Sequence, residues 1–193
     1  AEALESVLEG ISAGSLYQAN VARRLSGPMP SGAVTALYER LRRTNPAPFG
    51  ALWALDDALW LASNSPECLL TWDPTDRSVH SYPIKGTRPR GNTPEEDTAL
   101  AEALSRDAKE RAEHVMIVDL VRNDLGRVAC PGSVSVNDLF GVSSWSTVHH
   151  MVSDVRAVAR EDVDLIDILL ALFPGGSITG APKIAAMHWI EAV

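Results

Sequence analysis

The segment Pro83-Ile84-Lys85-Gly86-Thr87-Arg88-Pro89-Arg90-Gly91 stands where the sequence pattern changes from strand to helix. The alternating residues 77–82 before it indicate a β-strand. After it, Thr93-Pro94-Glu95-Glu96 has the form of a helix start, with a threonine cap and a glutamate three residues later. Because two prolines and two glycines surround one lysine and two arginines, we expect a stiff, positively charged turn that holds an anionic small molecule. An ordinary solvated basic loop has the same composition, so this segment alone leaves both interpretations open.

Composition is typical of a globular protein. With 193 residues, 46% of them hydrophobic and 22% charged, the chain is long enough for one domain or for a large part of a bigger one. A formal net charge of −8 disfavours nucleic acid and acidic membrane surfaces as partners. Cys68 and Cys130 lie far apart without metal-binding spacing, and the apolar run 168–173 is too short to span a bilayer. We therefore expect a cytoplasmic protein with reduced thiols and neither a membrane nor a nucleic-acid partner.

The order of apolar periods and turn residues predicts mixed α and β structure. Helices are expected at residues 4–11, 31–45, 94–124, 163–173 and from 181 onward, and strands at 16–25, 49–55, 58–62, 68–72, 78–84, 133–140 and 146–159. Ser31 is the expected cap of the second helix, and Asp107 the point where the long third helix breaks. Short polar turns between strands favour antiparallel pairing. We expect an α+β fold, with antiparallel sheets covered by helices. Both ends lie inside helical patterns, so residues 1–193 are expected to be one catalytic domain truncated at both ends.

Four acidic or basic side chains carry candidate chemistry. A lysine on a rigid turn, Lys85, is an amine nucleophile if its surroundings favour the neutral form. Glu110 and Glu113 share one face of a predicted helix, which suits Mg²⁺ because this ion takes one or two protein carboxylates. They would equally pair with Arg106, Lys109 or Arg111 on a solvated face. Glu67 follows a strand–turn junction, where it is either a general acid or a turn residue.

The glycine-rich loop 175–180 resembles a phosphate-binding loop, but Ala181 stands where the nucleotide motif requires lysine, and Lys183 comes two places late. A nucleotide site is therefore disfavoured, while glycine amides before a helix suit a carboxylate. His149 and His150 lie in a predicted strand, so one faces a site and the other is expected at the surface. The zinc and serine hydrolase motifs do not occur in the sequence.

Four segments follow one another in a recognisable order. They are Pro83–Gly91, Lys109-Glu110-Arg111-Ala112-Glu113-His114 with Ile117-Val118-Asp119-Leu120-Val121-Arg122-Asn123-Asp124, Val148-His149-His150-Met151-Val152-Ser153, and Phe173-Pro174-Gly175-Gly176-Ser177-Ile178-Thr179-Gly180-Ala181-Pro182-Lys183. They resemble the signatures of the chorismate-utilising enzymes over essentially the whole chain. Gly14-Ser15-Leu16-Tyr17-Gln18-Ala19-Asn20 resembles another, with Ser15 in place of the usual aspartate. A lysine at position 85 resembles the aminodeoxychorismate synthase component I branch, whereas anthranilate and isochorismate synthases usually carry alanine.

The resemblance implies a role for each matching residue. Lys85 would add to the chorismate ring and expel the 4-hydroxyl, and Glu67 would protonate that leaving group. Glu113 would bind Mg²⁺ directly and Glu110 through water. Thr87, His150, Gly175, Gly176, Ser177, Thr179, Gly180, Ala181 and Lys183 would contact the substrate. Ammonia from a glutamine amidotransferase subunit would then displace Lys85 and give 4-amino-4-deoxychorismate, a precursor of p-aminobenzoate and folate.

Two further implications concern completeness and alternatives. Members of this family continue beyond the position of Val193 with strands that supply a second metal-binding glutamate and a carboxylate-binding arginine, so we expect an incomplete site here. Anthranilate synthase component I is the competing enzyme, with Lys85 as the evidence against it. An inactive fragment or binding module that keeps the fold is the alternative of another class. Product formation from chorismate and ammonia separates the three.

Overall fold

The computed structural model describes residues 2–30 and 32–192 in two compact units. One unit is Arg23–Cys68, and the other joins the segment before it to the chain from Leu69 onward. Both combine helices with antiparallel strands, so the predicted α+β class is confirmed. Among the described residues, no helix has the length and apolar character needed to cross a membrane.

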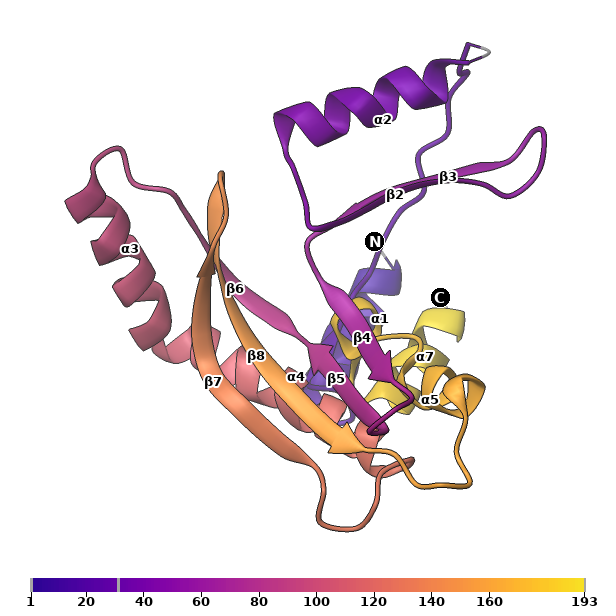
Figure 1. Ribbon diagram of the computed structural model, residues 1–193, viewed down its shortest axis with the longest axis vertical. Coiled ribbons are helices and arrows are strands. Elements are labelled where there is room, and N and C mark those ends of the chain that lie inside the picture. Colours follow the sequence, from indigo (N-terminus) through magenta and orange to yellow (C-terminus); the bar gives the residue numbers. More distant parts are fainter. Residues whose placement is uncertain (1, 31, 193) are drawn as a thin grey trace. The chain divides into compact units, whose positions relative to one another are not determined.

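A five-stranded sheet with β8 at its centre forms the framework of the larger unit. Its strands are β4 (Cys68–Asp73), β5 (Ser78–Tyr82), β6 (Ile84–Pro89), β7 (Ser135–Ser144) and β8 (Val148–Val158). β7 runs antiparallel along one side of β8, and β5 followed by β6 runs antiparallel along the other, as Figure 1 shows. β4 pairs with β5. The expected strands at 133–140 and 146–159 are therefore confirmed as the long β7–β8 hairpin.

β5 and β6 form one nearly continuous strand along β8 instead of a strand followed by a turn. Ser81 pairs with Val155, and Ile84 resumes the same register opposite Val152. Pro83 lies between them, buried, and accepts a hydrogen bond from the β8 backbone although it has no N–H to return. The predicted stiff turn is thus wrong. Most of that segment is a strand, because its hydrogen-bonding partner lies far along the chain and leaves no local sequence signal.

The strand β6 carries a bulge around Gly86. Ile84 pairs with Val152 and Thr87 pairs with His150, so β6 takes three steps where β8 takes two. Gly86 has a φ of 88°, in the left-handed region that glycine adopts without steric strain. The bulge bends the strand and changes which face the following side chains occupy.

Side chains of β8 alternate strictly between two environments. Its odd-numbered residues from 149 to 157 are buried, while the even-numbered ones are half-buried or exposed. Two helices, α4 (Ala108–Gly126) and α5 (Leu165–Leu172), contribute to the core on the buried face. This core consists mainly of Val79, Val118, Val121, Leu125, Val155, Ala157, Ile168, Ala171 and Leu172. The sheet therefore has one apolar face and one more polar face.

The starts of α3 (Pro94–Arg106) and α4 follow the predicted caps. The Thr93 hydroxyl accepts a hydrogen bond from the Glu96 amide at 3.2 Å. The Glu96 carboxylate reaches one residue further than expected and accepts from the Asn92 amide at 2.7 Å. Asp107 ends α3 and caps α4 by accepting from the amides of Lys109 and Glu110. The predicted break in the long helix is confirmed.

The remaining elements of this unit join its two ends. α1 (Glu2–Ser12) leads to β1 (Gln18–Ala19), which pairs with β9 (Gly180–Ala181) between α6 (Gly176–Thr179) and α7 (Lys183–Ala192). The expected strand at 16–25 is wrong beyond these two residues, because only Gln18 and Ala19 find a partner strand. The helices expected at 4–11, 163–173 and from 181 are confirmed as α1, α5 and α7.

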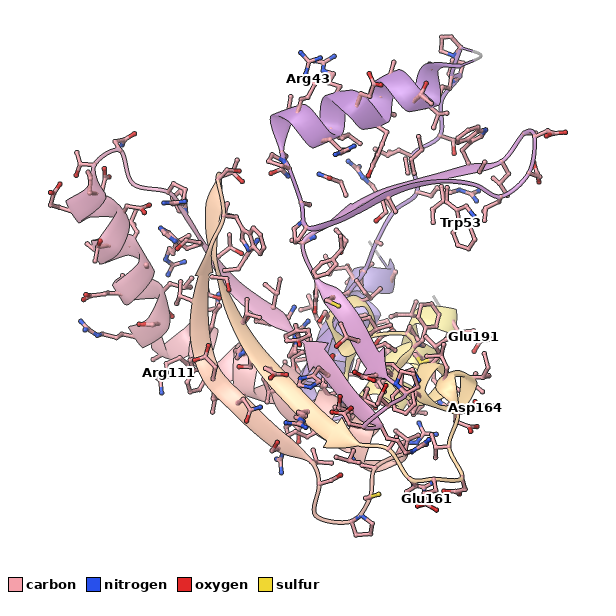
Figure 2. All side chains as sticks on the ribbon, viewed as in Figure 1. Arg43, Trp53, Arg111, Glu161, Asp164 and Glu191 are labelled. Carbon is pink, nitrogen blue, oxygen red and sulfur yellow. The ribbon has the colours of Figure 1, made fainter. Side chains whose placement is uncertain are left out.

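The unit Arg23–Cys68 consists of α2 (Ala33–Thr44) and the antiparallel hairpin of β2 (Phe49–Ala54) and β3 (Trp60–Ser65). Gly50 on β2 lies against the Tyr38 hydroxyl of α2, so the helix covers one face of the hairpin. Trp53 is 63% exposed and projects from the hairpin in Figure 2. The helix and the hairpin are confirmed, whereas the predicted cap Ser31 lies outside the described residues.

We predict that Gly86→Ala lowers the free energy of unfolding by about 2 kcal/mol, because alanine is strained at positive φ and overpacks its site. A Cβ there would lie 3.1 Å from Leu104 Cδ1 and 3.2 Å from Glu110 Oε2. Urea denaturation of the whole chain measures the change. Gly126→Ala is the matched control, since a Cβ at the end of α4 meets nothing within 4 Å. Equal stability of the two variants would contradict the bulge.

Candidate active site

The bulge of β6 brings Lys85 next to two predicted substrate-binding residues. Thr87 Oγ1 lies 3.0 Å from Nδ1 of His150 on β8, and the imidazole also hydrogen-bonds the Gly86 backbone. Burial lowers the pKa of His150, and the Gly86 hydrogen bond raises it to a smaller extent. His150 is therefore held as a neutral ring beside the bulge near pH 7. The strand pairing thus brings the backbones of Lys85, Thr87 and His150 close together.

The N-terminal turn of α4 closes on the same bulge. Arg88 Nη2 lies 2.8 Å from Asp107 Oδ2, and Arg88 Nη1 lies 3.5 Å from Glu110 Oε1. Glu110 also packs against Gly86, whose missing side chain leaves room for the carboxylate. The same ion pairs that anchor the helix therefore place a predicted metal ligand directly behind the bulge.

Both arginines of the motif form ion pairs within the protein. Arg88 contacts Asp107 and Glu110, and Arg90 holds Asp97 through two hydrogen bonds of 2.7 and 2.6 Å. The expectation that these charges converge on an anionic ligand is wrong for the arginines, because acidic residues at the starts of α3 and α4 neutralise them. Lys85 is the exception: within residues 2–30 and 32–192 it makes no ion pair.

Glu113 lies one helical turn after Glu110 and is 42% exposed. Its carboxylate is 3.7 Å from Lys109 Nζ, an exposed pair that contributes little stability. Arg111, another cation considered as a partner, instead stacks on Phe140 of β7, 4.0 Å from the ring centre. Glu113, with its exposed ion pair, and Glu110, which also contacts Arg88, lie on one helix face. This pair of carboxylates is a donor set that fits Mg²⁺ completed by water and substrate oxygens. In the part of the chain that is described, no group of three or more potential ligands occurs.

The glycine-rich loop folds into one helical turn that packs closely on its surroundings. The amides of Ile178 and Thr179 donate to the Gly175 carbonyl, and Thr179 Oγ1 does the same. A Cβ on Gly176 would lie 2.3 Å from Leu120 of α4. The Ser177 carbonyl accepts from the Asn20 side chain at 2.8 Å, which ties the loop to the segment before the other unit. Gly180 and Ala181 then form β9.

Lys183 lies in the interior. Its Nζ is 2.6 Å from Asp124 Oδ2 and donates to the Leu172 carbonyl at 2.8 Å, and both charged side chains are 7% exposed. Burial raises the pKa of Asp124, and the lysine partly offsets this shift. The pair joins α4, α5 and α7. The predicted substrate contact by Lys183 has no support in this geometry, since its charge is already paired.

Glu67, the predicted acid, belongs to the other unit. It lies between β3 and β4, half-buried, and its amide donates to Ser65 Oγ at 3.2 Å. The same hydroxyl donates to the Glu67 carbonyl at 3.1 Å. These bonds hold the backbone of the junction between the two strands.

Two buried histidines near the site were not anticipated. His149 is 1% exposed and hydrogen-bonds Asp97 and Ser144, so its expected surface position is wrong. His114 on α4 is fully buried, with Nε2 2.7 Å from Ser153 Oγ of β8. Burial lowers the pKa of His114 to about 4. Strand alternation correctly sends His149 and His150 to opposite faces, but helices cover the face on which His149 lies.

Comparison with known proteins identifies the family. The model of the chorismate binding enzyme family matches residues 1–193. The chain belongs to this family. It is 43% identical over 190 residues to aminodeoxychorismate synthase component 1 of Bacillus subtilis (strain 168), covering 98% of the chain and 40% of that protein. It is 47% identical over 193 residues to an anthranilate synthase component 1 of Haloarcula marismortui, covering all of the chain and 39% of that protein.

A solved structure of the same family has the same fold. Anthranilate synthase component I from Streptococcus pneumoniae superimposes with a TM-score of 0.80 at 32% identity, covering 99% of this chain and 41% of the other. The predicted chorismate-utilising fold is therefore confirmed. The chain spans about 40% of the length of the curated relatives it matches.

We predict that Lys183→Met lowers the unfolding free energy of this chain by roughly 3 to 5 kcal/mol, because it leaves the Asp124 carboxylate buried without its partner. The double variant Asp124→Asn/Lys183→Met should recover much of that loss. Urea denaturation measures both. A stable single variant with weakened chorismate binding would instead return Lys183 to the substrate site.

We also predict that stability falls between pH 6.5 and pH 4 because of His114. In this range the unfolded chain takes up a proton that the folded imidazole, with a pKa of about 4, does not bind. Unfolding therefore becomes easier as the pH falls, by up to about 3 kcal/mol in total. His114→Gln does not titrate and can still hydrogen-bond Ser153, so its unfolding free energy should change less over this range. Parallel curves for the two proteins would contradict the assignment.

Proposed function

We propose that this chain is the chorismate-binding part of an aminodeoxychorismate synthase component I. The observation that carries the proposal is the environment of Lys85. It is the one cation of its motif that no carboxylate engages within residues 2–30 and 32–192, while Arg88 and Arg90 are both paired. A lysine at this position also separates this branch, by resemblance, from enzymes that carry alanine there. Identities of 43% and 47% to members of the two branches support neither over the other.

The proposed reaction exchanges the 4-hydroxyl of chorismate for an amino group. The neutral Lys85 amine forms a carbon–nitrogen bond to the ring, and the bond to the 4-hydroxyl breaks. The leaving oxygen takes a proton, assigned by resemblance to Glu67, and departs as water. Ammonia then forms a new carbon–nitrogen bond, the bond to Lys85 breaks, and its electron pair returns to the lysine. Chorismate and ammonia thus give 4-amino-4-deoxychorismate and water, with Lys85 regenerated after proton loss.

His150 and Thr87 would orient the ring next to Lys85. Because burial lowers the pKa of His150, its imidazole stays neutral. It would therefore add no positive charge near the amine of Lys85. Thr87 fixes the imidazole ring of His150 through the 3.0 Å hydrogen bond. Both side chains therefore act by position.

Glu113 and Glu110 are the residues that would hold Mg²⁺. The exposed ion pair of Glu113 with Lys109 is weak enough to be replaced by a metal ion. When bound, Mg²⁺ would neutralise a carboxylate of the dianionic substrate. We further propose that ammonia comes from a separate glutamine amidotransferase subunit and that the enzyme works in the cytoplasm.

Anthranilate synthase component I is the second candidate. The Haloarcula marismortui relative, 47% identical over the whole chain, is an enzyme of this kind. Under that reading Lys85 would be a positioning charge and the product would be anthranilate. The two candidates therefore differ in one product, which makes them separable in a single assay.

We predict that Lys85→Ala and Lys85→Arg both abolish formation of aminodeoxychorismate in the full-length gene product supplied with chorismate, ammonia and Mg²⁺. Alanine removes the nucleophile, and the arginine guanidinium does not deprotonate in the working range. Chorismate binding, measured by calorimetry, should change little. Arg106→Ala, which removes an exposed cation of α3, is the control and should retain turnover. Near-normal amination by either Lys85 variant, or anthranilate as the wild-type product, would reject the proposed branch.

A further inference from the structure

A polar network around the buried His149 lies on the helix-covered face of the sheet, directly behind the site. Asp97, in the first turn of α3, accepts hydrogen bonds from Arg90, from the Gly91 amide at 2.8 Å and from His149 Nε2 at 2.9 Å. Arg90 also reaches the Trp145 carbonyl at the tip of the β7–β8 hairpin. One carboxylate therefore ties the end of β6, the hairpin and α3 to a single point.

The contact with Asp97 sets the proton position of His149. The hydrogen bonds from Arg90, Gly91 and His149 hold the pKa of Asp97 well below its usual range, so its carboxylate is ionised and only accepts. His149 Nε2 must therefore carry a hydrogen. Nδ1, on the other side of the ring, lies 2.8 Å from Ser144 Oγ and accepts from that hydroxyl when the ring is neutral. The ring is 1% exposed, and both of its nitrogens have partners.

The place of His149 in the sheet connects this network to the site. His149 pairs with Arg88 on β6, and the next residue, His150, pairs with Thr87. The register shift at Gly86 follows immediately, so regular pairing with β6 does not hold β8 on that side. A ring clamped from α3 and β7 can supply the missing constraint on the backbone of β8.

We propose that Asp97 and His149 are positioning residues for the reaction: Asp97 fixes the imidazole of His149 through Nε2–H, and this clamp holds His150 in line with Thr87 at the bulge. The inference rests on the proposed function in that His150 is taken as a substrate-contacting residue. Neither Asp97 nor His149 touches the substrate in this arrangement. They act through the β8 backbone.

Three variants separate positioning from packing. His149→Gln keeps an N–H donor that can reach Asp97, whereas His149→Leu fills similar space without a donor. Ser144→Ala removes only the hydrogen bond on the opposite side of the ring. In the full-length protein with chorismate, ammonia and Mg²⁺, we expect kcat to fall about tenfold in His149→Leu, with KM changed less than about twofold. His149→Gln and Ser144→Ala should keep kcat within about threefold of wild type.

Equal losses in His149→Gln and His149→Leu would overturn the proposal, since packing alone would explain them, and so would a change confined to KM. If His149→Leu does not fold, Asp97→Asn replaces it: its amide group faces Arg90 without charge, and kcat should fall in the same way. Circular dichroism melting verifies folding in each case.

A spectroscopic readout is independent of the reaction. The ¹⁵N spectrum of the wild-type protein should show His149 protonated at Nε2, and the imidazole signals of His150 should shift in His149→Leu but not in His149→Gln. The proposed clamp would be rejected if His149 were protonated at Nδ1 alone. It would also be rejected if the His150 signals were unchanged in both variants. If the wild-type protein does not consume chorismate, the proposed function fails, and these signals alone decide whether His150 is positioned in this way.

Discussion

The close packing of α4 against the bulge of β6 is the contact on which the rest of the site depends. Gly86 has no side chain, so the Glu110 carboxylate can lie against the strand. An arginine beside a helix N-terminus is unfavourable by itself, because that end of the helix carries partial positive charge. Asp107 reverses this effect because it accepts from the helix amides and pairs with Arg88, and Glu110 adds a second contact with Arg88. The same charges thus start the helix and fasten it to the strand that carries Lys85.

Features with local causes could be predicted from the sequence. The caps at Thr93 and Asp107 depend on hydrogen bonds between residues two to three apart, and both helices begin where expected. The β2–β3 hairpin follows from a short polar turn between apolar runs. The assembly of Lys85, Thr87 and His150 was accessible only through the family resemblance, because residues distant in sequence meet by strand pairing.

The errors have a common physical origin in partners that are distant along the chain. Prolines and glycines around Lys85 favour a turn, yet the β8 backbone supplies enough hydrogen bonds to make the segment a strand. A strand at 16–25 lacked such a partner beyond two residues. Alternation predicts that His149 and His150 lie on opposite faces, but it does not predict that helices cover the face of His149. Asp97 has the sequence position of an ordinary acidic residue at a helix start. Its hydrogen bonds with Arg90 and His149 therefore leave no signal in the sequence.

The pairing of the two motif arginines matters for the binding of an anionic substrate under the proposed function. If Arg88 and Arg90 were unpaired, they would attract any anion and would repel a positively charged neighbour. Their pairing with Asp97, Asp107 and Glu110 makes that part of the motif a structural clamp. Under the proposed function, Glu110 and Glu113 would then recognise a substrate carboxylate through a metal ion. Within residues 2–30 and 32–192, no carboxylate pairs with Lys85. Under the proposed function, its reactivity would then depend on its position beside the bulge more than on surrounding charge.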